Sequence, residues 1–304
     1  MSFPRSRESM RNKKTYDLLI IGAGSAGLGA GIQAAHLGME HAIIERKEPQ
    51  SRLLLARRVE NFPLAGAGGQ SGPELYRSLI AQSRQSGVNR IPGLVSSIEI
   101  NRRVFIVDAG KKRYQTRAVI LATGLMPKKL GRKIAPQELE GKKIFYRWTD
   151  IPLGKRKEKV LVIGGGEVAF DQACSLAEKG FEVTMAIRAK TDRVFDSLRG
   201  EAVKLGIRVK YETEILKLAD GRGGIEATLS VSGQAVHEIF NHCLTAIGSI
   251  RNLPDLTPSA RQYLNAGLFL AGDAAHPKIK QAAIAFGDGI KMTIEAYEYI
   301  RKDR

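Results

Sequence analysis

Apolar residues along this chain gather in short runs that end at glycine-rich turns. The segment YDLLIIGAGSAGLGAGIQAAHLGMEHAIIE, residues 16–45, passes from an apolar run through a glycine turn and a stretch of small residues to a second apolar run. This order predicts a strand, a helix and a second strand, which together form a βαβ unit. The same order returns in KVLVIGGGEVAFDQACSLAEKGFEVTMAIR, residues 159–188. The chain is therefore predicted to be an α/β protein with two Rossmann-like, three-layer domains.

The first unit carries the glycine spacing of a dinucleotide-binding turn. One glycine permits the tight turn, the next lets the backbone approach a pyrophosphate, and the third lets the helix pack close to the strand. The N-terminus of the helix then faces the phosphates. At the end of the second strand, Glu45 can accept hydrogen bonds from both hydroxyls of an adenosine ribose. The predicted turn residues are Gly22, Gly24, Ser25, Ala26 and Gly27.

The second unit predicts a second dinucleotide site, and the residues after its second strand bear on whether it prefers NADPH or NADH. Its second strand ends without an acid, and three basic residues follow it instead. Cations at this place suit a 2′-phosphate, so NADPH rather than NADH is the predicted coenzyme. The alternative is that these three are only exposed basic residues in a basic protein. The predicted NADPH-binding residues are Gly164, Gly166, Glu167, Ala169, Arg188, Lys190 and Arg193.

Two later apolar runs fit the first unit rather than the second. They are AVILATG at 118–124 and GLFLAGDAA at 267–275, which ends in Gly272 and Asp273. Asp273 could bond a ribityl hydroxyl or a phosphate-linked chain. A long helix is predicted from near Gln281, and its positive end would favour electron density on N1 and O2 of a flavin. The first nucleotide is therefore predicted to be FAD.

Together these segments resemble the thioredoxin reductase-like flavoproteins, class II of the pyridine nucleotide-disulfide oxidoreductases. The resemblance runs from about residue 16 to residue 300. Its carriers are GAGSAG, VENFP at 59–63, GPEL at 72–75, ILATG, GGGEVA, AIG at 246–248 and AGDAA followed by KQ and GDG.

The family layout implies that an NAD(P)H domain, residues 124–246, is inserted in an FAD domain, residues 1–123 and 247–304. Hinges are expected near Gly124 and Gly248, about which the domains rotate so that nicotinamide and substrate reach the flavin in turn. A homodimer is expected as well. Beyond the turn, the predicted FAD-binding residues are Glu45, Arg46, Asn61, Ala122, Thr123, Gly124, Gly272, Asp273, Lys280, Gln281 and Ala282.

The resemblance departs from the family at FYRWTDIP, residues 145–152. Thioredoxin reductases carry a CxxC at a fixed distance before the second glycine turn. Counting back without a gap puts Arg147 and Asp150 at the two cysteine positions. Neither can attack a disulfide or replace the sulfur that contacts the flavin. The two cysteines present, Cys174 and Cys243, are expected to be buried structural thiols on a helix and a strand, so thioredoxin reduction by this route is excluded.

Two residues between and at these positions are candidate catalytic groups. Trp148 is the only tryptophan and is predicted either near the flavin or nicotinamide, or as a packing residue. Asp150 is predicted either as a proton donor beside flavin N5, if burial raises its pKa, or as a surface carboxylate paired with a lysine. His276 lies in a loop next to a predicted flavin contact, where solvation is the simpler expectation. The histidines show no metal-binding spacing, so no metal is predicted.

Charge and composition indicate which classes of binding partner to expect. Forty-eight Lys and Arg against 31 Asp and Glu give a net charge of +17, which favours acidic partners. Nucleic-acid binding is not favoured, because stacking aromatics and module signatures are absent. No apolar run is long enough to cross a bilayer, and the basic start of the chain lacks an apolar signal region, so a cytoplasmic location is expected. Basic clusters lie at 111–113, 128–133, 142–143 and 155–159.

Two classes of electron acceptor remain open. One is an acidic carrier such as ferredoxin or flavodoxin, because the family includes ferredoxin-NADP reductases without CxxC. Those reductases usually carry a C-terminal extension over the flavin, and this sequence ends at EYIRKDR. The other class is a small molecule such as a quinone, free flavin, disulfide-like metabolite or oxygen. A different interpretation is a non-catalytic flavin- or nucleotide-binding protein that senses redox state or binds a partner.

Overall fold

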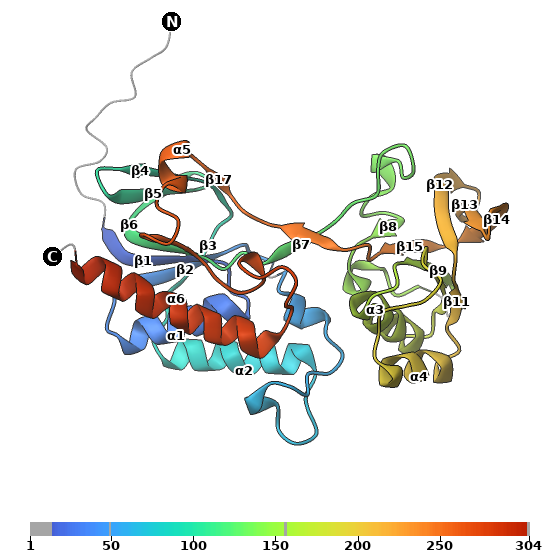
Figure 1. Cartoon of the computed structure of the whole chain (residues 1–304), viewed down its shortest axis with the longest axis horizontal. Coiled ribbons are helices and arrows are strands. Elements are labelled where there is room, and N and C mark those ends of the chain that lie inside the picture. Colours follow the sequence, from blue (N-terminus) through green and yellow to red (C-terminus); the bar gives the residue numbers. More distant parts are fainter. Residues whose placement is uncertain (1–13, 49, 155–156, 303–304) are drawn as a thin grey trace, which may run out of the picture. The chain divides into compact units, whose positions relative to one another are not determined.

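The computed structural model describes residues 14–48, 50–154 and 157–302. The start of the chain, and part of the basic cluster at 155–159, lie outside the described residues. The chain forms two compact units (Figure 1). Unit 1 contains the described residues up to 54, with 58–125 and those from 251 on. Unit 2 contains 126–250 and also the short segment Leu55–Arg57.

Unit 1 is built on a sheet whose strands run in the order β17-β4-β5-β6-β1-β2-β3, with β18 also paired to β6. The long strand β6 joins two kinds of pairing, because its first half is antiparallel to β5 and its second half is parallel to β1 and β18. The strands are β1 (Thr15–Ile21), β2 (His41–Glu45), β3 (Arg90–Pro92), β4 (Val95–Asn101), β5 (Val104–Ala109), β6 (Lys112–Leu121), β17 (Asp255–Leu256) and β18 (Leu268–Leu270).

Helices α1, α2 and α6 lie together on one side of this sheet (Figure 1). Glycines let α1 and α6 cross closely. A Cβ placed on Gly289 would lie 1.9 Å from the Ala26 carbonyl oxygen, and one on Gly29 would lie 2.5 Å from that of Phe286. The Thr293 hydroxyl donates to the Ala30 carbonyl at 3.2 Å across the same crossing. The helices of unit 1 are α1 (Ser25–His36), α2 (Gly72–Gln85), α5 (Pro258–Arg261) and α6 (Ala282–Lys302).

Unit 2 has a parallel five-stranded sheet in the order β11-β10-β9-β15-β8. A three-stranded antiparallel sheet, β12-β13-β14, packs against one side of it through a shared apolar cluster that includes Leu161, Leu218 and Leu229. Helices α3 (Glu167–Glu178) and α4 (Asp196–Lys204) belong to a second cluster around Phe170. The strands are β8 (Ile144–Phe145), β9 (Lys159–Ile163), β10 (Glu182–Ala186), β11 (Arg208–Lys210), β12 (Thr213–Gly221), β13 (Gly224–Val231), β14 (Gln234–Phe240) and β15 (His242–Thr245).

The predicted elements match the structure closely. Both predicted βαβ units are present, as β1-α1-β2 and β9-α3-β10, and the predicted final helix begins at Ala282. The chain passes between the units along β7 (Leu125–Pro127) and returns along β16 (Ser249–Arg251), and these two strands pair with each other. The α/β class predicted from the sequence is confirmed.

Candidate functional site

The first glycine turn closes between β1 and α1 in unit 1. Gly22 has φ +104°, in the region that favours glycine, and a Cβ there would lie 2.5 Å from the Ala122 carbonyl oxygen. A Cβ on Gly27 would lie 1.8 Å from the Gly22 carbonyl oxygen. At Gly24, by contrast, the nearest atom to such a Cβ is the Ser51 hydroxyl at 3.7 Å. Gly22 and Gly27 therefore allow close packing, while Gly24 leaves room for a ligand to approach the backbone.

Unpaired polar atoms surround this turn. Ser25, the first residue of α1, has a buried hydroxyl without a hydrogen-bond partner among the described residues. The same holds for the Thr123 hydroxyl, which follows β6, and for Nη1 of Arg52. Buried polar groups in proteins are normally paired. An anionic, hydroxyl-rich cofactor such as FAD would supply the missing partners, so the residues present fit it.

Glu45 lies at the end of β2, where the sequence places it. Its carboxylate accepts hydrogen bonds from the backbone N–H groups of Ala23 and Arg46. The first bond ties the end of β2 to the glycine turn. Arg46 turns its guanidinium to Gln50 at 2.7 Å.

The other predicted FAD-binding residues also belong to unit 1. Asn61 donates to the Gln281 side chain at 2.5 Å, which joins the loop before α2 to the start of α6. Gly272 has φ +65°, and its N–H donates to Asp288 at 2.6 Å. Asp273 lies 3.9 Å from Arg52, and burial raises the pKa of Asp273. The exposed members are Asn61, Lys280 and Gln281. The backbone of Ala122, Thr123, Gly124 and Ala282 lies at strand and helix ends.

The second glycine turn repeats this geometry in unit 2. Gly164 has φ +137°, and a Cβ there would lie 2.4 Å from the Ala246 carbonyl oxygen and 3.3 Å from the Ala169 methyl. A Cβ on Gly166 would meet nothing within 4 Å. Gly166 is followed by Glu167, the exposed first residue of α3. The turn is again tight at its first position and open at the residue before the helix.

The basic residues after β10 are held beside this turn. The N–H of Arg193 donates to the Gly165 carbonyl at 3.1 Å, and the side chains of Arg188, Lys190 and Arg193 are all exposed. Among the residues that the structure describes, the one carboxylate paired with Lys190 is that of Glu212, at 3.9 Å.

A carboxylate inside the same loop fixes its conformation. Asp192, whose side chain is 2% exposed, accepts hydrogen bonds from Arg199 at 2.7 Å and from the Tyr211 hydroxyl at 2.6 Å. The hydrogen bonds from Arg199 hold the pKa of Asp192 down at about 2. The loop is therefore ordered by Asp192, while the basic side chains beside it have no close ion-pair partner in the described ranges.

FYRWTDIP begins at the last residue of β8 and contains a short 3-10 turn over Trp148–Asp150. The indole of Trp148 packs against the apolar cluster of unit 2, and its Nε1 donates to the Leu55 carbonyl at 3.2 Å. Its backbone N–H donates to the Gln172 side chain at 2.9 Å. These contacts favour the packing alternative for Trp148. Asp150 is exposed and accepts from the Thr149 hydroxyl at 3.3 Å, and no described lysine pairs with it.

The chain from residue 16 to residue 289 matches the model of the pyridine nucleotide-disulphide oxidoreductases. It belongs to this family. A thioredoxin reductase of Listeria monocytogenes is 26% identical over 311 residues, with 95% of each chain covered. Among solved structures, thioredoxin reductase of Lactococcus lactis in its FR conformation has a TM-score of 0.83 at 23% identity, with 95% of this chain and 100% of that chain covered.

A second solved structure has the same fold at lower identity. Bacillithiol disulfide reductase Bdr of Staphylococcus aureus has a TM-score of 0.75 at 15% identity, with 96% of this chain and 100% of that chain covered. The resemblance to thioredoxin reductase-like flavoproteins is thus confirmed, as are the two-domain dinucleotide-binding fold and the cofactors of the family, FAD and NADPH. No helix in the described ranges is long and apolar enough to cross a membrane. Within those ranges, no cluster of His, Cys, Asp and Glu could hold a metal ion.

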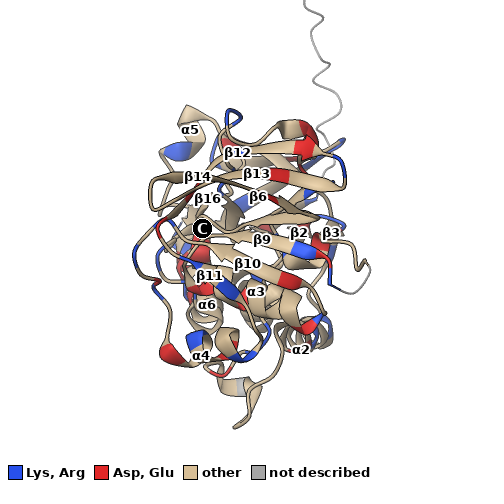
Figure 2. Ribbon diagram, turned by 90° about the vertical axis from the view of Figure 1, so that its right-hand side faces the viewer, with Lys and Arg blue, Asp and Glu red and all other residues tan. Residues whose placement is uncertain are grey.

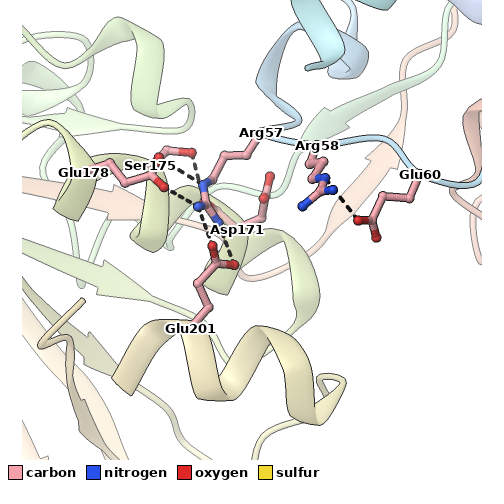
Figure 3. Close-up of polar contacts among 7 residues, drawn as sticks. All are labelled: Arg57, Arg58, Glu60, Asp171, Ser175, Glu178 and Glu201. Atoms are coloured by element: carbon pink, nitrogen blue, oxygen red, sulfur yellow. Dashed lines mark hydrogen bonds and ion pairs between the residues drawn. The ribbon is translucent and has the colours of Figure 1, made fainter. Parts of the chain in front are cut away.

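This oxidoreductase also contains an ion cluster that the sequence did not predict. Arg57 inserts its guanidinium between two carboxylates of unit 2 (Figure 3). It donates two hydrogen bonds to Glu178 on α3 and two to Glu201 on α4, with Nη1 to Glu201 at 3.0 Å and Nε to Glu178 at 3.2 Å. Only 15% of the Arg57 side chain is exposed. Its partners lie more than a hundred residues away in the chain, so no local pattern could reveal them.

Asp171 adds a third carboxylate to this cluster, and burial raises its pKa to about 6. The unfolded value is about 3.9. Because the folded chain binds this proton more tightly, Asp171 contributes stability that is present below about pH 4 and is lost as the pH rises through 6. Around it stand Arg57, which favours ionisation, and Glu178 and Glu201, which oppose it.

Asp171→Asn, which cannot ionise, is therefore expected to be more stable than the wild type at pH 7 by about 1 to 2 kcal/mol, and equally stable near pH 4. Urea unfolding of both proteins between pH 4 and 7, followed by fluorescence of Trp148, measures this difference in unit 2. A stability difference that does not change with pH would contradict the assignment.

Proposed function

We propose that this protein passes electrons from NADPH through FAD to an acceptor without a redox dithiol. The state of the thiols carries the proposal. Cys174 and Cys243 are the only cysteines, and both side chains are completely buried. Burial raises their pKa values to about 11 and about 12. The thiolate, which is the form that attacks a disulfide, is therefore disfavoured at both positions.

We assign FAD to unit 1 and NADPH to unit 2, which keeps the predicted insertion of one domain in the other. When bound, FAD supplies the redox chemistry by accepting a hydride from NADPH. The open backbone at Gly24 would approach the pyrophosphate, the Glu45 carboxylate would hold the ribose hydroxyls, and Asp273 would bond the ribityl chain. Each of these groups lies in the same unit.

In unit 2, the open N-terminus of α3 at Gly166 would face the phosphates of NADPH. The exposed guanidinium groups of Arg188 and Arg193, with Lys190, would bind the 2′-phosphate. The loop that carries them is held by Asp192 and by the bond from Arg193 to Gly165. Preformed loop geometry lowers the cost of ordering these cations around a phosphate.

Trp148 and Asp150 remain candidates for a role at the place of the missing dithiol. The hydrogen bond from the indole to Leu55 supports a packing role for Trp148. Asp150, which is exposed, would have to donate a proton from a solvated position. Of the two, only Asp150 has a side chain free to reach a substrate.

For the acceptor, we propose an acidic electron carrier such as ferredoxin or flavodoxin, or a small molecule. The net charge of +17 supports an acidic partner. On the parallel sheet of unit 2 the charges are mixed, since one acidic segment of the otherwise uncharged β10 lies between basic segments of β9 and β11 (Figure 2). The listeria relative carries the name of a thioredoxin reductase, and reduction of thioredoxin is the competing outcome. A cytoplasmic homodimer stays a prediction, as does the alternative of a non-catalytic redox sensor.

The test uses a Cys174→Ser, Cys243→Ser protein. Anaerobic mixing with NADPH should bleach the flavin absorbance within seconds, and turnover with a quinone or an acidic carrier should persist near the wild-type rate. Turnover that falls steeply with added salt would identify a charged carrier.

If NADPH does not bleach the flavin of the wild type, the result would favour the alternative of a non-catalytic redox sensor. Loss of turnover in a folded double variant that keeps its FAD, or reduction of thioredoxin by the wild type, would defeat the dithiol-free route.

Coenzyme choice gives a second prediction. Arg188→Ala should weaken NADPH about tenfold and leave NADH unchanged, because a charge-assisted hydrogen bond is worth about 1.5 to 3 kcal/mol. Flavin reduction rates at varied coenzyme concentration measure the affinity for NADPH and the affinity for NADH. Arg208→Ala is the matched control, because Arg208 is an exposed arginine of unit 2 that pairs with Glu182 at 2.5 Å. Equal use of NADH and NADPH by the wild type would refute the role of these cations.

A further inference from the structure

Arg52 is a charged side chain in unit 1 that lacks an adequate partner. It begins a short 3-10 helix, Arg52–Leu55, and its side chain is 27% exposed. Nη1 is buried and has no hydrogen-bond partner among the described residues. Its nearest carboxylate is Asp273, at 3.9 Å, which is beyond hydrogen-bond range. Burial lowers the pKa of Arg52 and raises that of Asp273, so their mutual attraction does not offset the loss of solvent.

Contacts on both sides place Arg52 beside the start of α1. The preceding residue, Ser51, has its hydroxyl next to Gly24, at 3.7 Å from the position of a Cβ. Gly272, which precedes Asp273, packs against Ala26, whose methyl lies 2.8 Å from a Cβ position on the glycine. The residues that precede Arg52 and Asp273 thus both lie close to the start of α1.

The start of α1 has a partial positive charge, and no carboxylate from the described part of the chain caps it. Gly24 caps the helix without a side-chain hydrogen bond, and the first turn contains no acidic residue. Ser25 is 8% exposed, and its hydroxyl is buried and unpaired. The partial positive charge of a helix start therefore lies beside an underpaired guanidinium and a free hydroxyl donor.

We propose that Arg52 binds the diphosphate of FAD. The fork of parallel N–H groups on a guanidinium matches phosphate oxygens, and the helix start and Ser25 supply further donors to the same anion. The Asp273 carboxylate, 3.9 Å from Arg52 Nη1, accepts no hydrogen bond from that atom and would bond a ribityl hydroxyl. The inference rests on the assignment of FAD to unit 1.

One consequence distinguishes this role from ordinary packing. Without FAD, Arg52 is a partly buried charge whose nearest described carboxylate is 3.9 Å away, and we expect it to destabilise unit 1. With FAD, the same side chain stabilises the complex. Replacement of Arg52 by an uncharged residue of similar length should therefore change stability in opposite directions: it should stabilise the cofactor-free protein and destabilise the FAD complex.

The experiment compares wild type with Arg52→Met, stripped of flavin and then titrated with FAD, ADP and adenosine. Arg52→Met should weaken FAD and ADP about tenfold or more and leave adenosine, which has no phosphate, unchanged. The melting temperature of the cofactor-free variant should equal or exceed that of cofactor-free wild type, and its FAD complex should melt lower than the wild-type complex. Arg52→Lys, which keeps the charge but loses the fork, should bind FAD with intermediate affinity.

Arg58→Met is the matched control. It removes an arginine from the same loop, but Arg58 is 63% exposed and pairs with Glu60 at 3.0 Å. FAD affinity should not change in this variant. Unchanged affinity of Arg52→Met for FAD and ADP, or an equal fall in melting temperature with and without FAD, would overturn the inference. If wild type itself binds no FAD, the assignment of unit 1 fails instead.

Discussion

Gly289→Ala is expected to destabilise unit 1 by about 3 kcal/mol or more and to release FAD. The added methyl would lie 1.9 Å from the backbone oxygen of Ala26, and a backbone atom cannot move aside as a side chain can. The strain separates α6 from α1, whose first turn is the expected phosphate-binding element. Flavin fluorescence, which rises on release, together with circular dichroism during heating, measures both effects.

A control for this change lies two residues earlier in α6. A methyl on Gly287 would meet nothing within 4 Å, so Gly287→Ala should stabilise the helix by about 0.5 to 1 kcal/mol through the higher helix propensity of alanine. Similar destabilisation by both variants would mean that glycine flexibility, rather than the close crossing, matters in α6.

Arg57→Ala is expected to destabilise unit 2 by about 2 to 3 kcal/mol. Loss of one partner from a buried ion pair typically costs about 3 to 5 kcal/mol. The lower figure applies here because Glu178 and Glu201 are each nearly half exposed, at 46% and 43%. Trp148 is the only tryptophan and belongs to unit 2, so its fluorescence during urea unfolding reports on this unit alone.

Two further variants separate charge from packing at Arg57. Glu201→Gln added to Arg57→Ala removes one of the stranded carboxylates and should recover part of the lost stability. Arg58→Ala, at an exposed neighbouring position, should change stability by less than about 0.5 kcal/mol. If the double variant is no more stable than Arg57→Ala, the packing of the Arg57 alkyl chain, and not its charge, holds the segment Leu55–Arg57 in place.

The accuracy of the sequence predictions follows the distance over which each signal acts. The glycine turns, Glu45 at the end of β2 and the start of α6 near Gln281 depend on residues within one βαβ unit or one helix, and the structure places all of them as predicted. Turn chemistry and apolar runs are local properties, so they are legible in a single chain.

Pairs of side chains that are far apart in the sequence could not be predicted in the same way. The fold alone brings Arg52 near Asp273 and Arg57 to Glu178. In the sequence RLLLARR, the two arginines look like ordinary surface charges. The antiparallel sheet of β12, β13 and β14 was not predicted either. Asp192 was missed because a carboxylate among basic residues suggests a surface ion pair, whereas its side chain is almost completely buried.

The segment Leu55–Arg57 bears on how such a protein could exchange parts during evolution. Residues 126–250 form a continuous segment that could be exchanged as a cassette. However, the cation for the carboxylates on α3 and α4 comes from residues 55–57, which the unit 1 segment 58–125 separates from the cassette in the sequence. A transplanted cassette would bring Asp171, Glu178 and Glu201 together with no arginine between them. Successful chimeras should therefore carry LAR at 55–57 along with the cassette, or acquire neutral residues at two of the three acidic positions.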